Sequence, residues 1–269
     1  MLKNKFKNCG YCLFLRTSEK NEIMTKLSVN INKIATLRNA RGGNMPDVVK
    51  AAFDCENFGA QGITVHPRPD ERHIRYQDVY DIKKIVKTEF NIEGYPSENF
   101  INLVLKVKPT QVTLVPDPPD AITSNKGWDT KKHTDFLKDI IAVFKANGIR
   151  TSVFLDPCKE MVDFAAKTNT DRIELYTEAY AKDFYSDKTK AIKLYKEAAI
   201  QAKKYNIGLN AGHDLNLDNL AFMVAEIDNM LEVSIGHALI CDALYYGLEN
   251  SVQMYLNEIR KGVEGRIKG

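Results

Sequence analysis

From residue 26 onward, the chain alternates between short apolar runs and longer amphipathic runs. The short runs are rich in Val, Ile, Leu and Phe, which is typical of parallel strands covered on both faces. They predict eight strands, over residues 27–31, 62–66, 90–93, 111–115, 150–155, 172–176, 207–210 and 232–235. The amphipathic runs predict eight helices, over residues 46–58, 77–88, 97–107, 131–147, 159–168, 189–205, 217–227 and 238–260.

This alternation predicts the α/β class and a (β/α)8 TIM barrel, a single domain with a few extra helices over residues 27–269. A doubly wound open sheet is the alternative, and it is disfavoured because no GxGxxG turn follows any strand. Residues 1–26 form an N-terminal extension. We expect it to be disordered or to follow from a mis-assigned start, because its apolar patch is short for a signal peptide and Met24 directly precedes the first strand.

A longer connection, residues 116–130, joins the fourth and fifth predicted strands and contains three prolines and the only tryptophan, Trp128. A long loop on the active face of a barrel is often a lid. A rigid proline-rich surface loop is equally compatible with these residues, so both interpretations stay open.

The composition of the chain indicates which kinds of partner it can bind. The chain has 269 residues, of which 44% are hydrophobic and 27% charged, as in a soluble globular protein. No apolar run approaches the ~18 residues of a membrane span. The formal net charge of +3 equals the charge carried by residues 1–25, so the barrel region is neutral overall. We therefore expect neither a nucleic acid nor a membrane as a partner.

Polar side chains gather where the predicted strands end, which is where active sites form in this fold. Glu93 ends an apolar strand, so partial burial should raise its pKa toward the range of a general base. A buried ion-pair partner for Arg68 or Lys33 is the alternative role. Several imidazoles on one rim indicate acid–base chemistry, and four of the five histidines fall there: His66, His73, His213 and His237.

Two corners of this rim are suited to anions. Arg41 and Arg68 carry forked donors that match phosphate oxygens. Gly212 and Gly236 follow the seventh and eighth strands, where barrels commonly bind phosphate through backbone N–H groups and a helix N-terminus. Two separate corners indicate two phosphate groups. The polar segment 32–43 adds amide and guanidinium donors that suit phosphate or sugar oxygens. A solvated loop after the first strand is the alternative, and it is weakened because strands followed by polar clusters recur along the chain.

Taken together, these segments resemble the pyridoxine 5′-phosphate synthase family of the deoxyxylulose-dependent vitamin B6 pathway. The resemblance extends in order over nearly all of residues 27–250. It is carried by Val29-Asn30-Ile31, Ala35-Thr36-Leu37-Arg38-Asn39-Ala40-Arg41-Gly42, Gly62-Ile63-Thr64-Val65-His66, Asp70-Glu71-Arg72-His73-Ile74, Asn91-Ile92-Glu93, Asn210-Ala211-Gly212-His213 and Ile235-Gly236-His237-Ala238.

The resemblance implies a transferase that condenses 3-amino-2-oxopropyl phosphate with 1-deoxy-D-xylulose 5-phosphate. The condensation closes a pyridine ring and releases phosphate and water. The resemblance implies no metal and no organic cofactor, a homo-oligomer that is usually an octamer, and a cytoplasmic location. Its partners would then be two small phosphorylated substrates.

The resemblance also implies roles for individual residues. His66 and Glu93 match the proton acceptors, His213 the proton donor and Glu174 a glutamate that assists the reaction. Ligands of the aminoketone phosphate are implied at Asn30, Arg41, Asp214, Gly236 and His237. Ligands of the deoxyxylulose phosphate are implied at Arg68, His73 and Thr123, with Asn32 and Lys33 as altered candidates.

Two positions depart from the pattern of this family. Many members have Asp-His where this chain has Asn32-Lys33, so an amide and an ammonium replace a carboxylate and an imidazole. Others often have Gly where this chain has Asp214. A carboxylate there would repel a bound phosphate unless it points away. Asp214 could instead orient His213 or a helix N-terminus.

Three other interpretations remain open. A metal-dependent barrel isomerase or hydrolase could use His66, Glu93, His213 and Asp214 as ligands, although nearby Arg and Lys side chains would repel a cation. A Schiff-base aldolase could use Lys33 as its nucleophile. A barrel reused as a non-catalytic binding module is disfavoured, because the acid–base residues are present.

Overall fold

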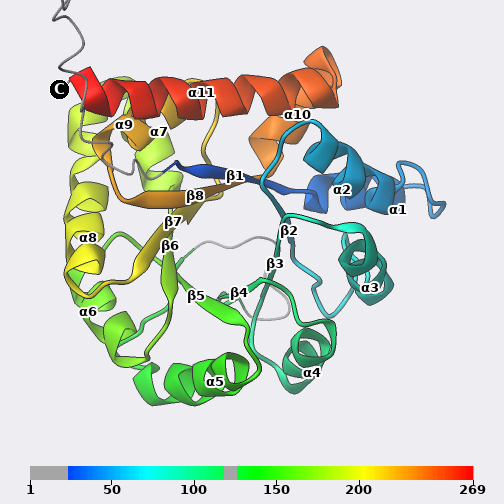
Figure 1. The fold of residues 1–269 in the computed structure, drawn as a ribbon, viewed down its shortest axis with the longest axis horizontal. Coiled ribbons are helices and arrows are strands. Elements are labelled where there is room, and N and C mark those ends of the chain that lie inside the picture. Colours follow the sequence, from blue (N-terminus) through cyan, green and yellow to red (C-terminus); the bar gives the residue numbers. More distant parts are fainter. Residues whose placement is uncertain (1–23, 118–125, 269) are drawn as a thin grey trace, which may run out of the picture.

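The computed structural model describes residues 24–117 and 126–268, and in them eight parallel strands close into a barrel (Figure 1). Each strand pairs with its neighbours in sequence, and the eighth closes on the first. The strands are β1 (Lys26–Asn30), β2 (Gly62–Val65), β3 (Glu89–Gly94), β4 (Gln111–Leu114), β5 (Arg150–Leu155), β6 (Arg172–Tyr176), β7 (Gly208–Gly212) and β8 (Met230–Ile235). The predicted (β/α)8 barrel is confirmed.

Helices surround the barrel, and the long C-terminal helix α11 lies along one side of it, beside α9 and α10 (Figure 1). The helices are α1 (Asn32–Asn39), α2 (Val48–Asn57), α3 (Tyr76–Ile85), α4 (Glu98–Val107), α5 (Thr134–Ala146), α6 (Lys159–Lys167), α7 (Glu178–Ala191), α8 (Lys193–Lys204), α9 (Leu220–Glu226), α10 (His237–Tyr246) and α11 (Leu248–Lys268). Among the described residues, no helix has the length and apolarity that a membrane crossing requires.

Several helix ends are fixed by local sequence. The Asp47 carboxylate accepts hydrogen bonds from two backbone N–H groups at the start of α2, and the Ser97 hydroxyl accepts one at the start of α4. Such caps satisfy donors that have no partner within the helix. Helix α4 ends at Lys108, which adopts the left-handed conformation.

The helix predictions need three corrections. The polar segment after β1 is not a loop, because residues 32–39 form α1. Helix α7 was not predicted, since its residues are mostly polar or charged and show weak periodicity. The single helix predicted over 238–260 is two helices, α10 and α11. They separate at Gly247, where a φ of 81° ends α10.

The two faces of the barrel wall carry opposite chemistry. Outward strand residues such as Val29, Ile63 and Ile92 are fully buried and pack with the helices in one apolar cluster. Inward residues are polar and bond to one another across strands. Their hydrogen-bonded series runs Ser28, Thr64, Asn91, Thr113. The strands were interpreted as apolar on both faces, which is wrong for the inward face.

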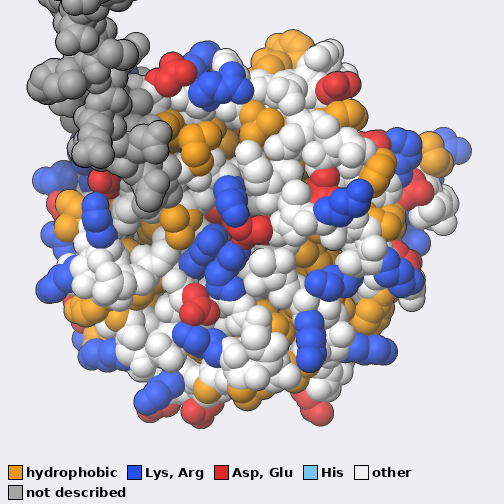
Figure 2. All heavy atoms as spheres, viewed as in Figure 1, with side chains coloured by type: hydrophobic (Ala, Val, Ile, Leu, Met, Phe, Trp, Pro, Cys, Tyr) orange, Lys and Arg blue, Asp and Glu red, His pale blue; other side chains and the backbone are white. Residues whose placement is uncertain are grey.

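The amino end of the barrel is closed by charged side chains. Glu89 forms ion pairs with Lys26 and Arg150, and Arg172 Nη1 lies 3.3 Å from Glu232 Oε2. Figure 2 shows basic and acidic side chains interspersed over one face of the molecule. The carboxyl end of the barrel is built differently, because it opens into a cavity.

Candidate active site

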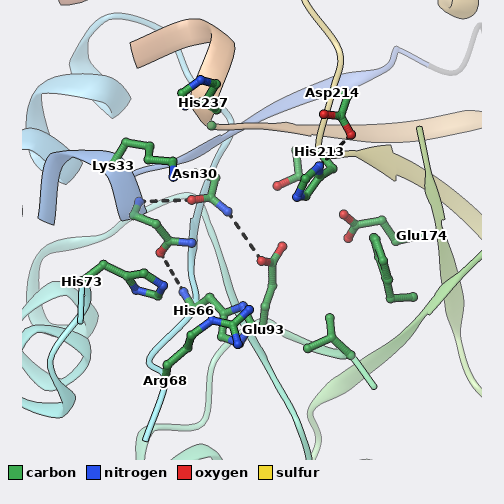
Figure 3. Close-up of a pocket in the computed structure, with 15 residues that line it drawn as sticks. Asn30, Lys33, His66, Arg68, His73, Glu93, Glu174, His213, Asp214 and His237 are labelled. Atoms are coloured by element: carbon green, nitrogen blue, oxygen red, sulfur yellow. Dashed lines mark hydrogen bonds and ion pairs between the residues drawn. The ribbon is translucent and has the colours of Figure 1, made fainter. Parts of the chain in front are cut away.

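A cavity of about 390 Å³ lies at the carboxyl ends of the strands (Figure 3). Every strand, or the residues directly after it, contributes to its wall. The cavity is lined by Asn30, Asn32, Lys33, His66, Arg68, His73, Glu93, Val115, Phe154, Glu174, His213, Asp214, Ser234, Gly236 and His237. Residues far apart in the sequence therefore meet in one space.

Most of the candidate site residues that lie in the described part of the chain line this cavity. Arg41 is exposed in the turn that follows α1 and is not part of the wall. Thr123 lies outside the described residues, as do most of the connection 116–130 and nearly all of the extension 1–26. The sequence reasoning omitted Val115, Phe154 and Ser234, although each lies at a strand end.

Asparagines of β1 and α1 connect the first three strands. The Asn30 Oδ1 accepts from the backbone N–H of Asn32 at 3.1 Å, and the Asn32 Oδ1 accepts from the backbone N–H of His66 at 2.9 Å. The Asn30 Nδ2 reaches Glu93 Oε2 at 3.5 Å (Figure 3). These contacts hold the backbone at His66 and the carboxylate of Glu93 in place.

Glu93 is the penultimate residue of β3, and its carboxylate faces the middle of the cavity (Figure 3). Burial raises its pKa to about 7, and the negative charges of Asp117 and Glu232 add to the rise. His213 and Arg68 oppose it with positive charge. A carboxyl group with this pKa can both accept and release a proton near neutral pH.

The wall beside Glu93, after β2, carries Arg68 and two imidazoles. Arg68 is only 3% exposed and donates from Nη2 to Asp117 Oδ2 at 2.6 Å. Burial and the neighbouring guanidinium of Arg68 lower the pKa of His73 to about 4 and hold the pKa of His66 well below its ordinary value. Both imidazoles are therefore neutral at pH 7. The backbone N–H of Ile74 donates to His73 Nδ1 at 2.9 Å, so the His73 proton is on Nε2.

His213 and Asp214 follow β7 as a bonded pair. The His213 Nδ1 lies 2.6 Å from Asp214 Oδ2. Burial alone would lower the pKa of His213, but the hydrogen bond and charge of Asp214, with the charges of Glu93 and Asp117, raise it. The pKa of His213 is therefore shifted upward, in the direction opposite to the shifts of His66 and His73.

Glu174 lines the cavity from β6 and is 3% exposed. Its Oε2 has no hydrogen-bond partner among the described residues. Burial raises the pKa of Glu174 well above its ordinary value, and the charges of Glu93 and Glu232 add to this. A Cβ on Gly212 would lie 2.7 Å from Glu174 Oε1, so this glycine leaves the room that the carboxyl group needs.

The described part of the connection after β4 is anchored beside the site. Trp128 is buried, donates from Nε1 to the Leu114 carbonyl at 3.0 Å and stacks on Tyr95. A Cβ on Gly127 would lie 2.2 Å from the backbone of Asp156, which only glycine permits. Within residues 24–117 and 126–268, no group of three or more His, Cys, Asp or Glu side chains is arranged to hold a metal ion.

Comparison with known proteins identifies the family of the chain that forms this cavity. The profile of the family described as "Pyridoxal phosphate biosynthesis protein PdxJ" matches residues 27–261. The chain belongs to the PdxJ family. It is 66% identical over 238 residues to the pyridoxine 5′-phosphate synthase of Cytophaga hutchinsonii, covering 88% of this chain and all of that protein. It is 61% identical over 237 residues to the enzyme of the same name from Christiangramia forsetii, with the same coverage.

Solved structures agree on the architecture of this PdxJ family member. Thiamine phosphate pyrophosphorylase from Pyrococcus furiosus aligns with a TM-score of 0.58 at 11% identity, over 89% of this chain and 98% of that one. Phosphoribosyl anthranilate isomerase from Thermotoga maritima aligns with a TM-score of 0.56 at 12% identity, over 88% and 99%. At such identities the likeness shows the fold alone.

Proposed function

We propose that this protein is a pyridoxine 5′-phosphate synthase, which condenses 3-amino-2-oxopropyl phosphate with 1-deoxy-D-xylulose 5-phosphate and releases phosphate and water. Family membership supports the reaction. One observation supports its location: Glu93, with a pKa of about 7, lines the same cavity as His213, whose pKa is raised. A buried carboxyl group that titrates near neutrality, together with an imidazole whose pKa is shifted upward, supplies the base and the acid that such a condensation needs.

The chemistry requires protons to be moved at carbon, nitrogen and oxygen. The amine of the aminoketone is the nucleophile, so no Ser or Cys of the protein is needed. Glu93, when ionised, accepts a proton from substrate carbon, and His213 donates one to the oxygen that leaves as water. The neutral imidazole of His66 is a second acceptor, and Glu174 is a buried carboxyl group able to assist.

Two regions of the wall are suited to the two phosphates. Arg68 and the neutral His73, whose Nε2 carries the proton, supply donors on one side. Gly236 and His237 begin α10 on the other side, where unpaired backbone N–H groups attract anions. We assign the deoxyxylulose phosphate to the first region and the aminoketone phosphate to the second. Holding both substrates in one cavity also removes the entropic cost of their encounter during the reaction.

The direct test is to incubate the purified protein with both phosphorylated substrates and to follow pyridoxine phosphate absorbance and released phosphate. We expect both products in equal amounts, with each substrate required. Exhaustive chelation should leave the rate unchanged; loss of activity would favour the metal-dependent alternative. Borohydride added with the keto phosphate should leave Lys33 unmodified, because a covalent adduct there would favour the Schiff-base alternative.

The proposal includes a homo-oligomer, an octamer, in the cytoplasm. Family resemblance supports this assembly. Three large apolar side chains at the end of α10 are more than half exposed, as an interface between copies requires: Leu244, Tyr245 and Tyr246. Light scattering on the eluting protein should give eight times the chain mass of 30.5 kDa. A monomer would contradict the assembly without touching the proposed reaction.

A further inference from the structure

The bonded pair after β7 has a part in the reaction beyond the roles assigned above. We propose that Asp214 is a positioning residue that holds the His213 imidazolium for proton donation, rather than a ligand of substrate phosphate. The inference rests on the proposed function and deepens it. A carboxylate can only accept, so the hydrogen bond of 2.6 Å places a proton on His213 Nδ1. In the imidazolium both ring nitrogens carry a proton, and we assign the proton on Nε2 to the substrate.

Hydrogen bonds to Thr177 also hold the backbone on both sides of His213. The backbone N–H of Asp214 donates to Thr177 Oγ1 at 3.1 Å, and that hydroxyl donates to the Gly212 carbonyl at 2.7 Å. This N–H is therefore engaged within the protein instead of facing a phosphate. His213 itself adopts a φ of 97°, which is rare for a residue with a side chain. Thr177 bridges the residues on both sides of this unusual conformation, so it helps to hold the His213 ring in place.

Other groups that face His213 determine what Asp214 must contribute. Glu93 on β3 and Asp117 after β4 add negative charge, and the Tyr176 ring on β6 packs edge-on at 5.2 Å between centroids. The Tyr176 hydroxyl donates to Glu178, so it does not compete for the imidazole. Glu174 completes this side of the cavity with a carboxyl group whose raised pKa favours its neutral form. Of these groups, Asp214 is the one whose carboxylate is bonded to the ring.

The step can be written with its atoms balanced. Glu93 removes a proton from substrate carbon, and the electron pair of that C–H bond forms a new C=C bond. The adjacent C–O bond breaks, its electron pair stays on oxygen, and the His213 Nε2 proton converts that hydroxyl into water. His213 becomes neutral and keeps its Nδ1 proton toward Asp214. A fixed carboxylate stabilises the imidazolium before this step and holds the ring in one orientation.

The test compares Asp214→Asn with the unchanged protein in two measurements. In the resting protein, ¹³C-labelled histidine signals are titrated by NMR, with His213 assigned from the signal missing in His213→Asn. We expect the His213 midpoint to fall by about one pH unit, a tenfold change in proton affinity. During turnover, kcat is measured as a function of pH. The pH at which kcat falls on the alkaline side of this profile (its alkaline limb) should decrease by a similar amount. Both KM values should stay within about twofold, because no substrate ligand is removed.

Two further variants make the result specific. Asp214→Glu keeps the charge and should restore most of the pH profile. Asp228→Asn removes a carboxylate on the connection before β8 that is 71% exposed and lies 3.4 Å from Lys203 Nζ. It should leave both the titration and the limb unchanged. A shift in Asp228→Asn as large as that in Asp214→Asn would overturn the inference, because loss of any negative charge would then suffice.

The remaining outcomes separate this inference from the proposed function. An unshifted His213 titration in a folded Asp214→Asn protein with normal turnover overturns the positioning role alone. A raised KM with an unshifted limb overturns it in favour of substrate binding by Asp214. Absence of product with the unchanged protein overturns the proposed function and, with it, this reaction step.

Discussion

Glu89 and Glu93 lie on the same strand and face the same interior, yet their carboxyl groups behave in opposite ways. Burial alone would raise the pKa of Glu89, but hydrogen bonds and charges from Lys26 and Arg150 lower it. Glu93 faces the cavity with carboxylates nearby, and its pKa rises to about 7. Four residues along one strand therefore separate a structural anion from a group able to exchange protons.

The difference teaches that the partners of a carboxyl group decide whether the effect of its burial on the pKa is offset. Around Glu89, the cations Lys26 and Arg150 offset the cost of removing its charge from water. At the carboxyl end, the cost of burying the charge of Glu93 is not fully offset, so the pKa of this carboxyl group is raised. The following variants test this contrast.

The largest effect is expected from Glu93→Gln, which removes the base and keeps the shape of the side chain. Turnover should fall by about 10²–10⁴-fold, the range usual for loss of a general base. Binding of each substrate, measured by calorimetry, should persist. Glu89→Gln is the matched control on the same strand and should keep kcat within about twofold of normal. Normal turnover in Glu93→Gln would contradict the assignment.

A smaller effect on rate is expected from Arg68→Ala. Charge-assisted hydrogen bonds contribute about 1.5–3 kcal/mol, so KM for the sugar phosphate should rise by about 10–100-fold. KM for the aminoketone phosphate should change little. Asp117→Asn is the control, since it removes the ion-pair partner but retains the guanidinium. Steady-state kinetics with each substrate varied separately distinguishes these effects, and an unchanged KM would remove Arg68 from the ligands.

Protein stability should respond to Glu93→Gln in the direction opposite to activity. The pKa of Glu93 is raised on folding from 4.5 to about 7, so the folded state pays to ionise it. Its contribution to stability is intact below pH 4.5 and is lost as pH rises through 7. The amide has no charge to bury, so the variant should be more stable by about 1–3 kcal/mol above pH 7 and by almost nothing at pH 4.5. Urea unfolding at both pH values measures the difference.

The smallest effect is expected from Glu89→Gln, with the reverse pH dependence. The folded-state pKa of Glu89 is lowered, so its stabilising contribution exists above its ordinary pKa of 4.5 and is lost as pH falls through the folded-state value. At pH 7 the variant should lose about 1 kcal/mol, because the Lys26 partner is partly exposed and solvent screens the pair. Equal stability of variant and parent at pH 7 would show that the charges at the amino end contribute little.

Much of this molecule could be predicted from the sequence because strand ends are marked by composition. Strands β5 and β6 have the predicted bounds, and predicted rim residues such as His66 and His213 line the cavity. The roles of these residues stay predictions. Helix α7 escaped prediction because tertiary packing, rather than a clear apolar stripe, supports its charged sequence.

The polar interior of the barrel was not predicted, for a different reason. Leu27, Val29 and Ile63 were interpreted together with their neighbours as continuous apolar strands, although Ser28 and Thr64 alternate with them. Period-two alternation was therefore present as a signal. The Arg68–Asp117 ion pair carried no such signal, because the separation of 49 residues is bridged only when β2 and β4 enter the same barrel.

Because inward and outward positions alternate along these strands, neighbouring residues are under different constraints during evolution. Outward positions hold the helices, so substitutions there are limited by volume and shape. Inward positions contribute little to that packing, so their side chains can change with the reaction while the architecture persists. A barrel wall of this kind lets new chemistry arise one residue at a time without rebuilding the protein that carries it.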